Sequence, residues 1–268
     1  MTLRRRGLDW LLNAYAGLAL IYLLLPIGVI LVFSFNNPVG RFNFVWQEFS
    51  LDAWKHPFAV EGIGSALEKS LQIAALSTIA ATILGTLTAL ALVRYEFKGR
   101  APVNFFIFIP LATPEVVLGA ALLSQFLNWG TPQLGFATIL IAHIMFNLSF
   151  VVITVRSRLI GFDRSLEEAA QDLGATPWET FRLVTLPLIM PGVVSAALLA
   201  FALSIDDFVI TNFNSGSTIT FPLFVWGAAR VAIPPQINVI GSAIFFIAVF
   251  LMLANVALQW RRQPKGAV

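Results

Sequence analysis

Six long apolar segments set the first constraint on what this chain can fold into. They cover roughly residues 11–34, 67–93, 103–127, 134–155, 187–212 and 237–260. Each is long enough to cross about 30 Å of hydrocarbon as a helix. The composition agrees, because 58% hydrophobic and 12% charged residues lie far from the values of a soluble domain. We therefore predict an all-α integral membrane protein with six transmembrane helices.

The connections between the spans indicate one membrane domain. We expect residues 35–66, the longest non-cytoplasmic segment, with Asn36, Pro38 and Trp54, to form an ordered external loop with a short helix at the membrane interface. The chain has no tandem repeat and no low-complexity tail. The sequence therefore predicts a single transmembrane domain over residues 1–268.

The basic residues orient the predicted helices. Thirteen of the 17 fall on one side of the six spans: Arg4, Arg5, Arg6, Arg94, Lys98, Arg100, Arg156, Arg158, Arg164, Arg182, Arg261, Arg262 and Lys265. The other side holds Arg41, Lys55, Lys69 and Arg230. Basic residues accumulate on the cytoplasmic side of membrane proteins, so both termini are predicted to be cytoplasmic. The clusters are short and lie at span ends, which does not favour nucleic-acid binding.

A polar island interrupts the apolar pattern between residues 165 and 187. Ser165 followed by Glu168 fits a capping box that would start one helix. Thr176 followed by Glu179 fits a second capping box. Gly174 between them would end the first helix, since glycine adopts the positive φ that helix ends often need. We expect two short amphipathic helices joined by a bend, suited to docking in water.

This island resembles a motif of a known family. Glu168-Ala169-Ala170, Gly174 and Val184-Thr185-Leu186-Pro187 are spaced as in the EAA loop of the membrane permeases of bacterial ABC importers, where Ile normally stands at the position of Val184. In that family the loop is a cytoplasmic coupling helix that lies in a cleft of the ATPase. The resemblance implies the type I permease fold, a coupling loop at about 156–186, and a place in the bacterial inner membrane. Without the resemblance, the island would be an ordinary pair of interfacial helices.

The resemblance also assigns residues and partners. It implies that ATPase coupling rests on six positions: Glu168, Ala169, Ala170, Gly174, Leu186 and Pro187. It implies a second, similar permease chain, a cytoplasmic ATPase dimer and an extracellular solute-binding protein. The chain contains no Gly-Lys pair and hence no phosphate-binding P-loop. ATP and Mg²⁺ would therefore be bound by the partner ATPase, and the chain itself would need no cofactor.

A narrower resemblance concerns the solute. The segments 202–211 and 114–119, together with Thr220-Phe221-Pro222-Leu223 and Pro235-Gln236-Ile237-Asn238, resemble the spermidine and putrescine permeases of the same superfamily. The resemblance therefore implies transport of polyamines. Permeases for other solutes, such as iron or organophosphonates, share parts of these segments, so another small solute stays an alternative.

Among the acidic residues within the predicted spans, three are candidates for a substrate pathway. Asp206 and Asp207 interrupt span five, and Glu115 lies in span three. A carboxylate at the bilayer centre costs about 2.5–3.5 kcal/mol on insertion scales, so these side chains should face a cavity or a partner helix. They could favour a cationic substrate, or one aspartate could cap a helix or pair with Arg230. We expect one aspartate of the pair to face the pathway.

Other chemistries find little support in the residues. A membrane-embedded enzyme using Asp206 and Asp207 is an alternative, but adjacent side chains on a helix point about 100° apart and would share a proton or metal poorly. The chain has no cysteine, and its two histidines are too few for a metal site. We expect His143, one turn before Asn147, to make a hydrogen bond between helices.

Overall fold

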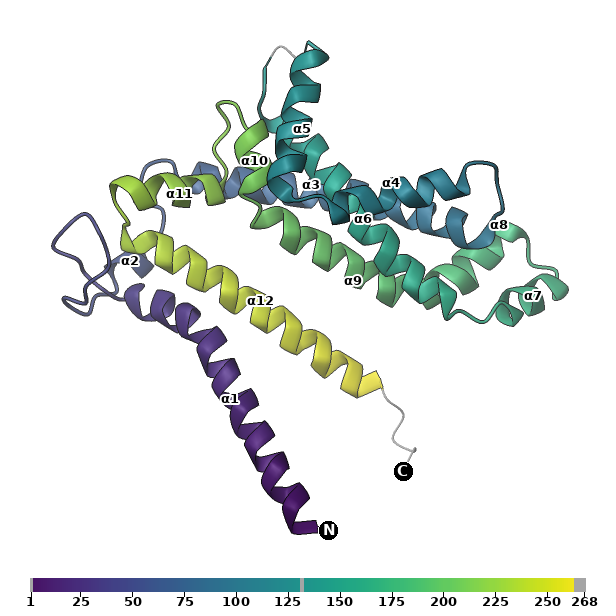
Figure 1. Cartoon of the computed structure of the whole chain (residues 1–268), viewed down its shortest axis with the longest axis horizontal. Helices are drawn as coiled ribbons and strands as arrows, with labels where there is room; N and C mark the ends of the chain where they lie inside the picture. The colour runs from purple at the N-terminus through teal and green to yellow at the C-terminus, as the bar shows by residue number, and fades with distance from the viewer. Residues whose placement is uncertain (1, 131–132, 263–268) are drawn as a thin grey trace. The chain divides into compact units, whose positions relative to one another are not determined.

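The computed structural model describes residues 2–130 and 133–262, and its regular elements in these ranges are helices (Figure 1). Two isolated bridges are the β-type pairings within the described residues. The chain divides into two compact units, one of Met1–Gly62 with Val225–Val268 and the other of Ile63–Phe224. The all-α membrane fold is thereby confirmed, while the single domain over residues 1–268 stays a prediction.

Three long helices form the centre of the unit Ile63–Phe224. These are α3 (Ile63–Arg94), α6 (Phe136–Ile160) and α9 (Leu186–Ile205), and each packs against the other two. Their shared core is rich in small and β-branched side chains: Ala81, Ala89, Val151, Val152, Val155, Ala196 and Ala200. Small residues let helix backbones approach closely in a membrane, where the lipid gives no hydrophobic drive for association. Close helix contact therefore organises this unit.

The third predicted span, residues 103–127, is wrong as a single helix. The structure has two helices there, α4 (Arg100–Ala112) and α5 (Glu115–Asn128), bent by 114°. Thr113 at the bend is extended, with φ −88° and ψ 130°. Pro114 follows it, lacks a backbone N–H and disfavours a helical conformation at the preceding residue. The apolar composition predicted the length of the segment but not this break.

The fifth predicted span, residues 187–212, is displaced at both ends. The helix begins earlier, because α8 (Pro177–Thr180) continues through the π-helical segment η1 (Phe181–Thr185) into α9. It ends at Ile205, before a second short helix, α10 (Val209–Asn214). The second capped helix of the polar island is therefore the start of a candidate membrane span, Pro177–Ile205, and not a separate element.

Four helices in the described residues are long and apolar enough to cross a membrane, or five if the bent pair α4–α5 is one span. They are Trp10–Phe33, Ile63–Arg94, Phe136–Ile160 and Pro177–Ile205. The helix α12 (Pro235–Arg262) occupies the place of the sixth predicted span, and Pro235–Phe250 counts as a shorter apolar helix. Six spans therefore stay a prediction, and Lys265 of the basic tail lies outside the described residues.

The other unit contains α1 (Thr2–Phe33), α2 (Asp52–Lys55) and α12, and α12 packs on both α1 and α2. The sequence boundary between the two units falls within α11 (Phe221–Val231).

Asn36 orders the loop that follows α1. Its side-chain amide donates to Asn43 Oδ1 at 2.6 Å and to the Val45 carbonyl at 2.9 Å, and its Oδ1 accepts from the Gln47 N–H at 2.7 Å. The Phe35 ring stacks on Trp54 with 5.5 Å between centroids. The expected ordered loop with a short helix is confirmed.

The contact between α3 and α6 leads to a stability prediction. A Cβ atom added at Gly85 would lie 2.6 Å from Val151 Cγ1 and 2.8 Å from Val151 Cβ. Gly85→Ala should therefore lower the free energy of unfolding by about 1–3 kcal/mol, as overpacking does. Gly17→Ala is the control, since nothing lies within 4 Å of its added Cβ. Denaturant titration of both purified variants in detergent measures the difference, and equal stabilities would contradict the close contact.

Candidate functional site

The first candidate site is the coupling loop, which the structure builds around the short helix α7 (Ser165–Asp172). The predicted capping box of Ser165 and Glu168 is wrong, because Ser165 already lies inside the helix. Its backbone N–H donates instead to Asp163 Oδ1 at 3.0 Å. This hydrogen bond holds the pKa of the Asp163 carboxyl below its ordinary value. A carboxylate two residues upstream thus supplies the cap that the sequence pattern placed on Ser165.

The end of α7 forms as the sequence predicts. Gly174 has φ 89°, its N–H donates to the Gln171 carbonyl at 2.9 Å, and the Ala175 N–H donates to the Ala170 carbonyl at 3.1 Å. These two bonds are those of a Schellman motif, which satisfies the last carbonyls of a helix. An added Cβ at Gly174 would meet no atom within 4 Å. The requirement for glycine is therefore conformational and does not come from crowding.

The second predicted cap is also confirmed. Thr176 Oγ1 accepts from the Glu179 N–H at 3.3 Å, and Glu179 Oε2 accepts from the Thr176 N–H at 2.8 Å. Pro177 occupies the first helical position, where its missing N–H leaves no bond unmade. The bend at Gly174 and this capping box together fix the direction in which the chain enters the long helix α8–η1–α9.

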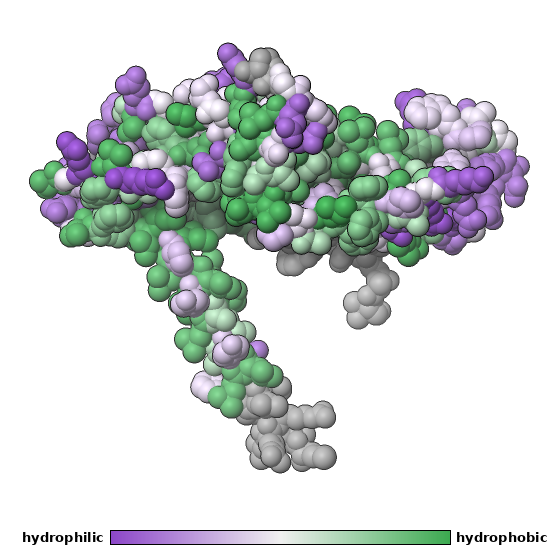
Figure 2. All heavy atoms as spheres, turned by 45° about the horizontal axis from the view of Figure 1, so that its top comes forward, coloured by the Kyte–Doolittle hydropathy of each residue, from purple (hydrophilic) through white to green (hydrophobic). Residues whose placement is uncertain are grey.

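The loop presents a mixed polar and apolar surface. Glu168 and Ala169 are exposed and Ala170 is half-buried, so the predicted contact residues lie at the surface. Leu173 and Trp178 are 91% and 67% exposed, large apolar side chains that the sequence pattern did not single out. Figure 2 shows hydrophilic residues gathered over this end of the unit. Exposed apolar groups within a polar rim are typical of an interaction surface.

The remaining predicted coupling residues lie elsewhere. Leu186 is half-buried and Pro187 is exposed, and both are in the first turn of α9. They follow the π-helical turn, in which the Leu186 N–H donates to the Phe181 carbonyl. Such a turn accommodates a helix irregularity near a proline. The exposed loop surface is built by α7 and α8, and a coupling role of Leu186 and Pro187 stays a prediction.

The second candidate site is the break between α9 and α10, where the two aspartates separate. Asp207 accepts hydrogen bonds from the Thr211 N–H at 2.8 Å, from the Ile210 N–H at 3.3 Å and from Thr211 Oγ1 at 2.8 Å. Its side chain is 6% exposed. Asp207 therefore caps the first turn of α10, and its neighbour Asp206, at the end of α9, is exposed.

His143 on α6 holds this cap in place. Its Nε2 lies 2.9 Å from Thr211 Oγ1 and 3.3 Å from Asp207 Oδ2. The Thr211 hydroxyl gives its one hydrogen to Asp207, so Nε2 carries a proton and donates to Thr211. The Nδ1 atom lies 2.7 Å from Ser204 Oγ on α9. The expected hydrogen bond between helices is confirmed, and it joins α6 to both sides of the break.

The third predicted pathway residue, Glu115, is exposed in the first turn of α5. One turn later, Gly119 lies against α10, where an added Cβ would be 2.7 Å from Phe213 Cδ2. Asn214 also donates to the Gly119 carbonyl at 3.4 Å. The structure therefore places Glu115 on a helix that packs directly on α10, while Asp206 is exposed at the end of α9 in the same unit.

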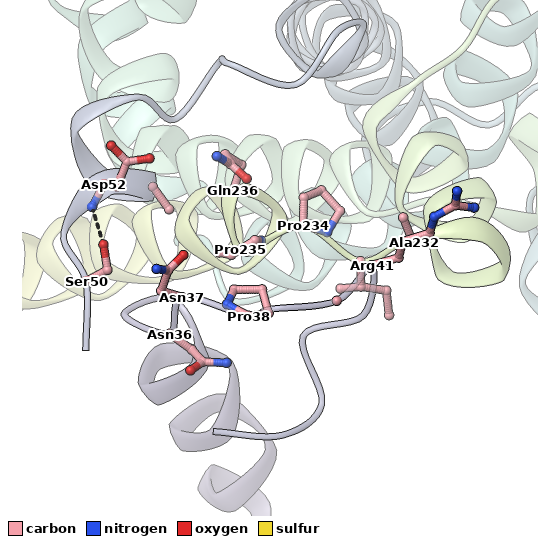
Figure 3. Close-up of a pocket in the computed structure, with 13 residues that line it drawn as sticks. Asn36, Asn37, Pro38, Arg41, Ser50, Asp52, Ala232, Pro234, Pro235 and Gln236 are labelled. Carbon is pink, nitrogen blue, oxygen red and sulfur yellow. Dashed lines mark hydrogen bonds between the residues drawn. The ribbon is translucent and has the colours of Figure 1, made fainter. Parts of the chain in front are cut away.

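A cavity of about 320 Å³ lies in the other unit, between the first loop and the start of α12. Figure 3 shows Asn37, Ser50, Asp52 and Gln236 around it, with Arg41 at its other end. Its charged groups have both signs, so the lining does not select one class of ion. None of the predicted site residues lies on it. Among the residues whose side chains the structure describes, no group of three or more His, Asp or Glu could hold a metal ion.

Comparison with known proteins gives concordant matches. Residues 81–262 match the family of binding-protein-dependent transport system inner membrane components. The chain is 37% identical over 246 residues to the spermidine/putrescine transport system permease protein PotC of Escherichia coli, covering 91% of this chain and 92% of that protein. It is 39% identical over 246 residues to the putrescine transport system permease protein PotI of Escherichia coli, covering 86% of each.

The fold has solved counterparts. A chain of a bacterial ABC transporter for import of the acidic polysaccharide alginate superposes with a TM-score of 0.68 at 17% identity, covering 98% of this chain and 99% of the other. At this identity the likeness concerns the fold alone. It agrees with the helical architecture described above.

The Schellman motif leads to a prediction on the loop. Gly174→Ala should destabilise the end of α7 by about 1–2 kcal/mol, since a side chain disfavours a φ of 89°. Hydrogen exchange of the backbone over residues 165–176 should become faster, with the amount of membrane-inserted protein unchanged. Gly161→Ala in the same loop is the control, because φ there is −85°. Equal exchange in the two variants would contradict the conformational role of Gly174.

Proposed function

The chain belongs to the family of binding-protein-dependent transport system inner membrane components and is a permease subunit of an ABC importer, and from this premise we propose that it carries polyamines such as spermidine and putrescine into the cell. The observation that carries the proposal is the 37% and 39% identity, over 86% or more of each chain, to permeases named for these solutes. An importer of another small solute is the alternative.

The break between α9 and α10, where Asp206 is exposed and Asp207 caps α10, is named the acidic corner and suits a polycation. A polyamine carries two or more ammonium groups on a flexible chain, and it loses hydration when it crosses hydrocarbon. An exposed carboxylate beside the pathway lowers that barrier, and it should bind weakly, since a deep energy well would trap the solute. We assign this role to Asp206, with Glu115 as a second carboxylate on the helix that packs against α10.

Asp207 has a different role in this proposal. Its carboxylate already accepts the N–H groups of Ile210 and Thr211 and faces His143, so little of its hydrogen-bonding capacity is left for a solute. The division between the aspartates also counts against a membrane-embedded enzyme, because a catalytic pair needs both carboxylates at one reacting group. We propose that Asp207 shapes the corner and that Asp206 faces the solute.

We further propose that the loop around α7 docks against a separate ATPase dimer. Glu168, Ala169, Leu173 and Trp178 offer an exposed carboxylate, a small side chain and two apolar groups on one loop. ATP and Mg²⁺ would be bound by that ATPase, because this chain has no P-loop. A second, similar permease chain and an extracellular solute-binding protein would complete the importer.

The solute assignment is tested by uptake. The complex reconstituted in liposomes should import labelled spermidine or putrescine. Asp206→Asn should reduce that import on the order of tenfold at low solute concentration, equivalent to ~1.4 kcal/mol, with the amount of assembled complex unchanged. Asp207→Asn should instead lower the amount of folded chain, because it removes the charge that faces His143.

The control for this experiment is Glu61→Gln, an exposed acid in the first external segment, which should leave uptake unchanged. If the complex imports neither polyamine, the solute assignment is wrong. If it imports them and Asp206→Asn does so at the same rate, the role of Asp206 is wrong and the solute assignment stands.

The orientation is a separate prediction. The loops 94–102 and 156–186 and both termini should face the cytoplasm, given the thirteen-to-four asymmetry of basic residues. Single cysteines replace Glu96 and Ser165, both exposed, while Gly99 is avoided because of its φ of 105°. An impermeant thiol reagent should label neither in intact spheroplasts and both in inverted vesicles. Val39→Cys, 87% exposed in the external loop, should show the opposite pattern.

A further inference from the structure

We propose that Glu167 is a positioning residue that transmits movement of the coupling loop to the membrane helices α3 and α9. The inference rests on the proposed docking of the loop to an ATPase and assigns the mechanical link on this chain's side. The two adjacent glutamates of α7 differ in exposure, and this difference is the starting point. Glu168 is exposed, whereas the Glu167 side chain is 12% exposed and faces the helix bundle.

Two membrane elements meet at the Glu167 carboxylate. Arg94, the last residue of α3, donates to Glu167 Oε1 through Nη2. Thr185, the last residue of η1, donates to the same oxygen through its hydroxyl. The Arg94 side chain is 24% exposed and Thr185 is fully buried. These three residues, named the Glu167 clamp, therefore join α7 to the end of α3 and to the end of η1, where α9 begins.

Further contacts hold the end of α3 to the residues that precede α7. The Arg94 guanidinium carbon lies 6.0 Å from the centroid of the Phe162 ring, within the range of a cation–π interaction. Arg164 Nη2 donates to the Val93 carbonyl at 3.2 Å. The end of α3 is thus bound both by the residues that precede α7 and by α7 itself. A displacement of α7 must move this end of α3 or break the clamp.

The clamp is connected to the helix core through α3 and through η1, whose last residues are Arg94 and Thr185. α3 packs along both α6 and α9, and η1 continues directly into α9. An ionic contact with low exposure is screened little by solvent, and removal of one partner leaves the other charge partly buried and unpaired. In this proposal the clamp passes a displacement of the loop to α3 and α9, while Glu168 at the exposed face contacts the partner.

The experiment compares the two adjacent glutamates. Glu167→Gln, Arg94→Gln and the matched control Glu168→Gln are each reconstituted with the partner permease, the ATPase and the binding protein. We expect Glu167→Gln and Arg94→Gln to retain the ATPase on purification. In both variants, the stimulation of ATP hydrolysis by solute-loaded binding protein should be at least fivefold lower than in wild type. Arg94→Lys, which keeps the charge, should retain most of the stimulation. Glu168→Gln should instead weaken retention of the ATPase.

A second measurement does not depend on any partner. In the purified permease chain, hydrogen exchange over residues 165–172 should quicken in Glu167→Gln and in Arg94→Gln and stay unchanged in Glu168→Gln. If Glu167→Gln matches wild type both in exchange and in stimulation, the clamp is overturned. If exchange quickens but stimulation is unchanged, the clamp exists without transmitting movement, and the proposal is overturned as well. A wild-type chain that retains no ATPase overturns the proposed docking, and with it the transmission.

Discussion

The close packing of α3, α6 and α9 is the constraint on which the rest of the unit Ile63–Phe224 depends. Alanines and valines fill the shared core, and Gly85 lies against Val151 with no room for a side chain. Because the backbones approach so closely, the ends of these helices are fixed relative to one another. Both candidate sites are built on those ends: the coupling loop at Arg94 and Thr185, and the acidic corner where α9 stops.

Each break in a helix leaves backbone groups that must find other partners away from water. A helix in hydrocarbon makes its own hydrogen bonds, so each interruption frees donors and acceptors that need other partners. After α9, the carboxylate of Asp207 takes the N–H groups of Ile210 and Thr211. His143 and Ser204 then satisfy the polar groups around it. An acid that the sequence placed on a substrate pathway is thus required to build the corner.

The sequence predicted what local chemistry determines and missed what distant residues determine. Segment length and apolar composition identified α1, α3, α6 and α12 but not the breaks in the third and fifth predicted spans, and the patterns at Thr176 and Gly174 identified a cap and a helix end. The cap at Ser165 failed because Asp163 competes for the same N–H group. Pro114 by itself indicates a break in the helix, but the angle of the bend depends on how α4 and α5 pack. The contact between Arg94 and Glu167 joins residues 73 positions apart, and no local pattern indicates such a pair.

Two pairs of adjacent acids show the same division of roles. In Asp206–Asp207 and in Glu167–Glu168, one carboxylate is held by internal donors and its neighbour is exposed. Consecutive side chains on a helix point about 100° apart, so only one of two neighbours can face the bundle. Between α9 and α10, the change in chain direction likewise turns Asp206 and Asp207 to different surroundings. A buried acid fixes the position of the backbone, and that position in turn decides where the exposed acid next to it meets a solute or a partner.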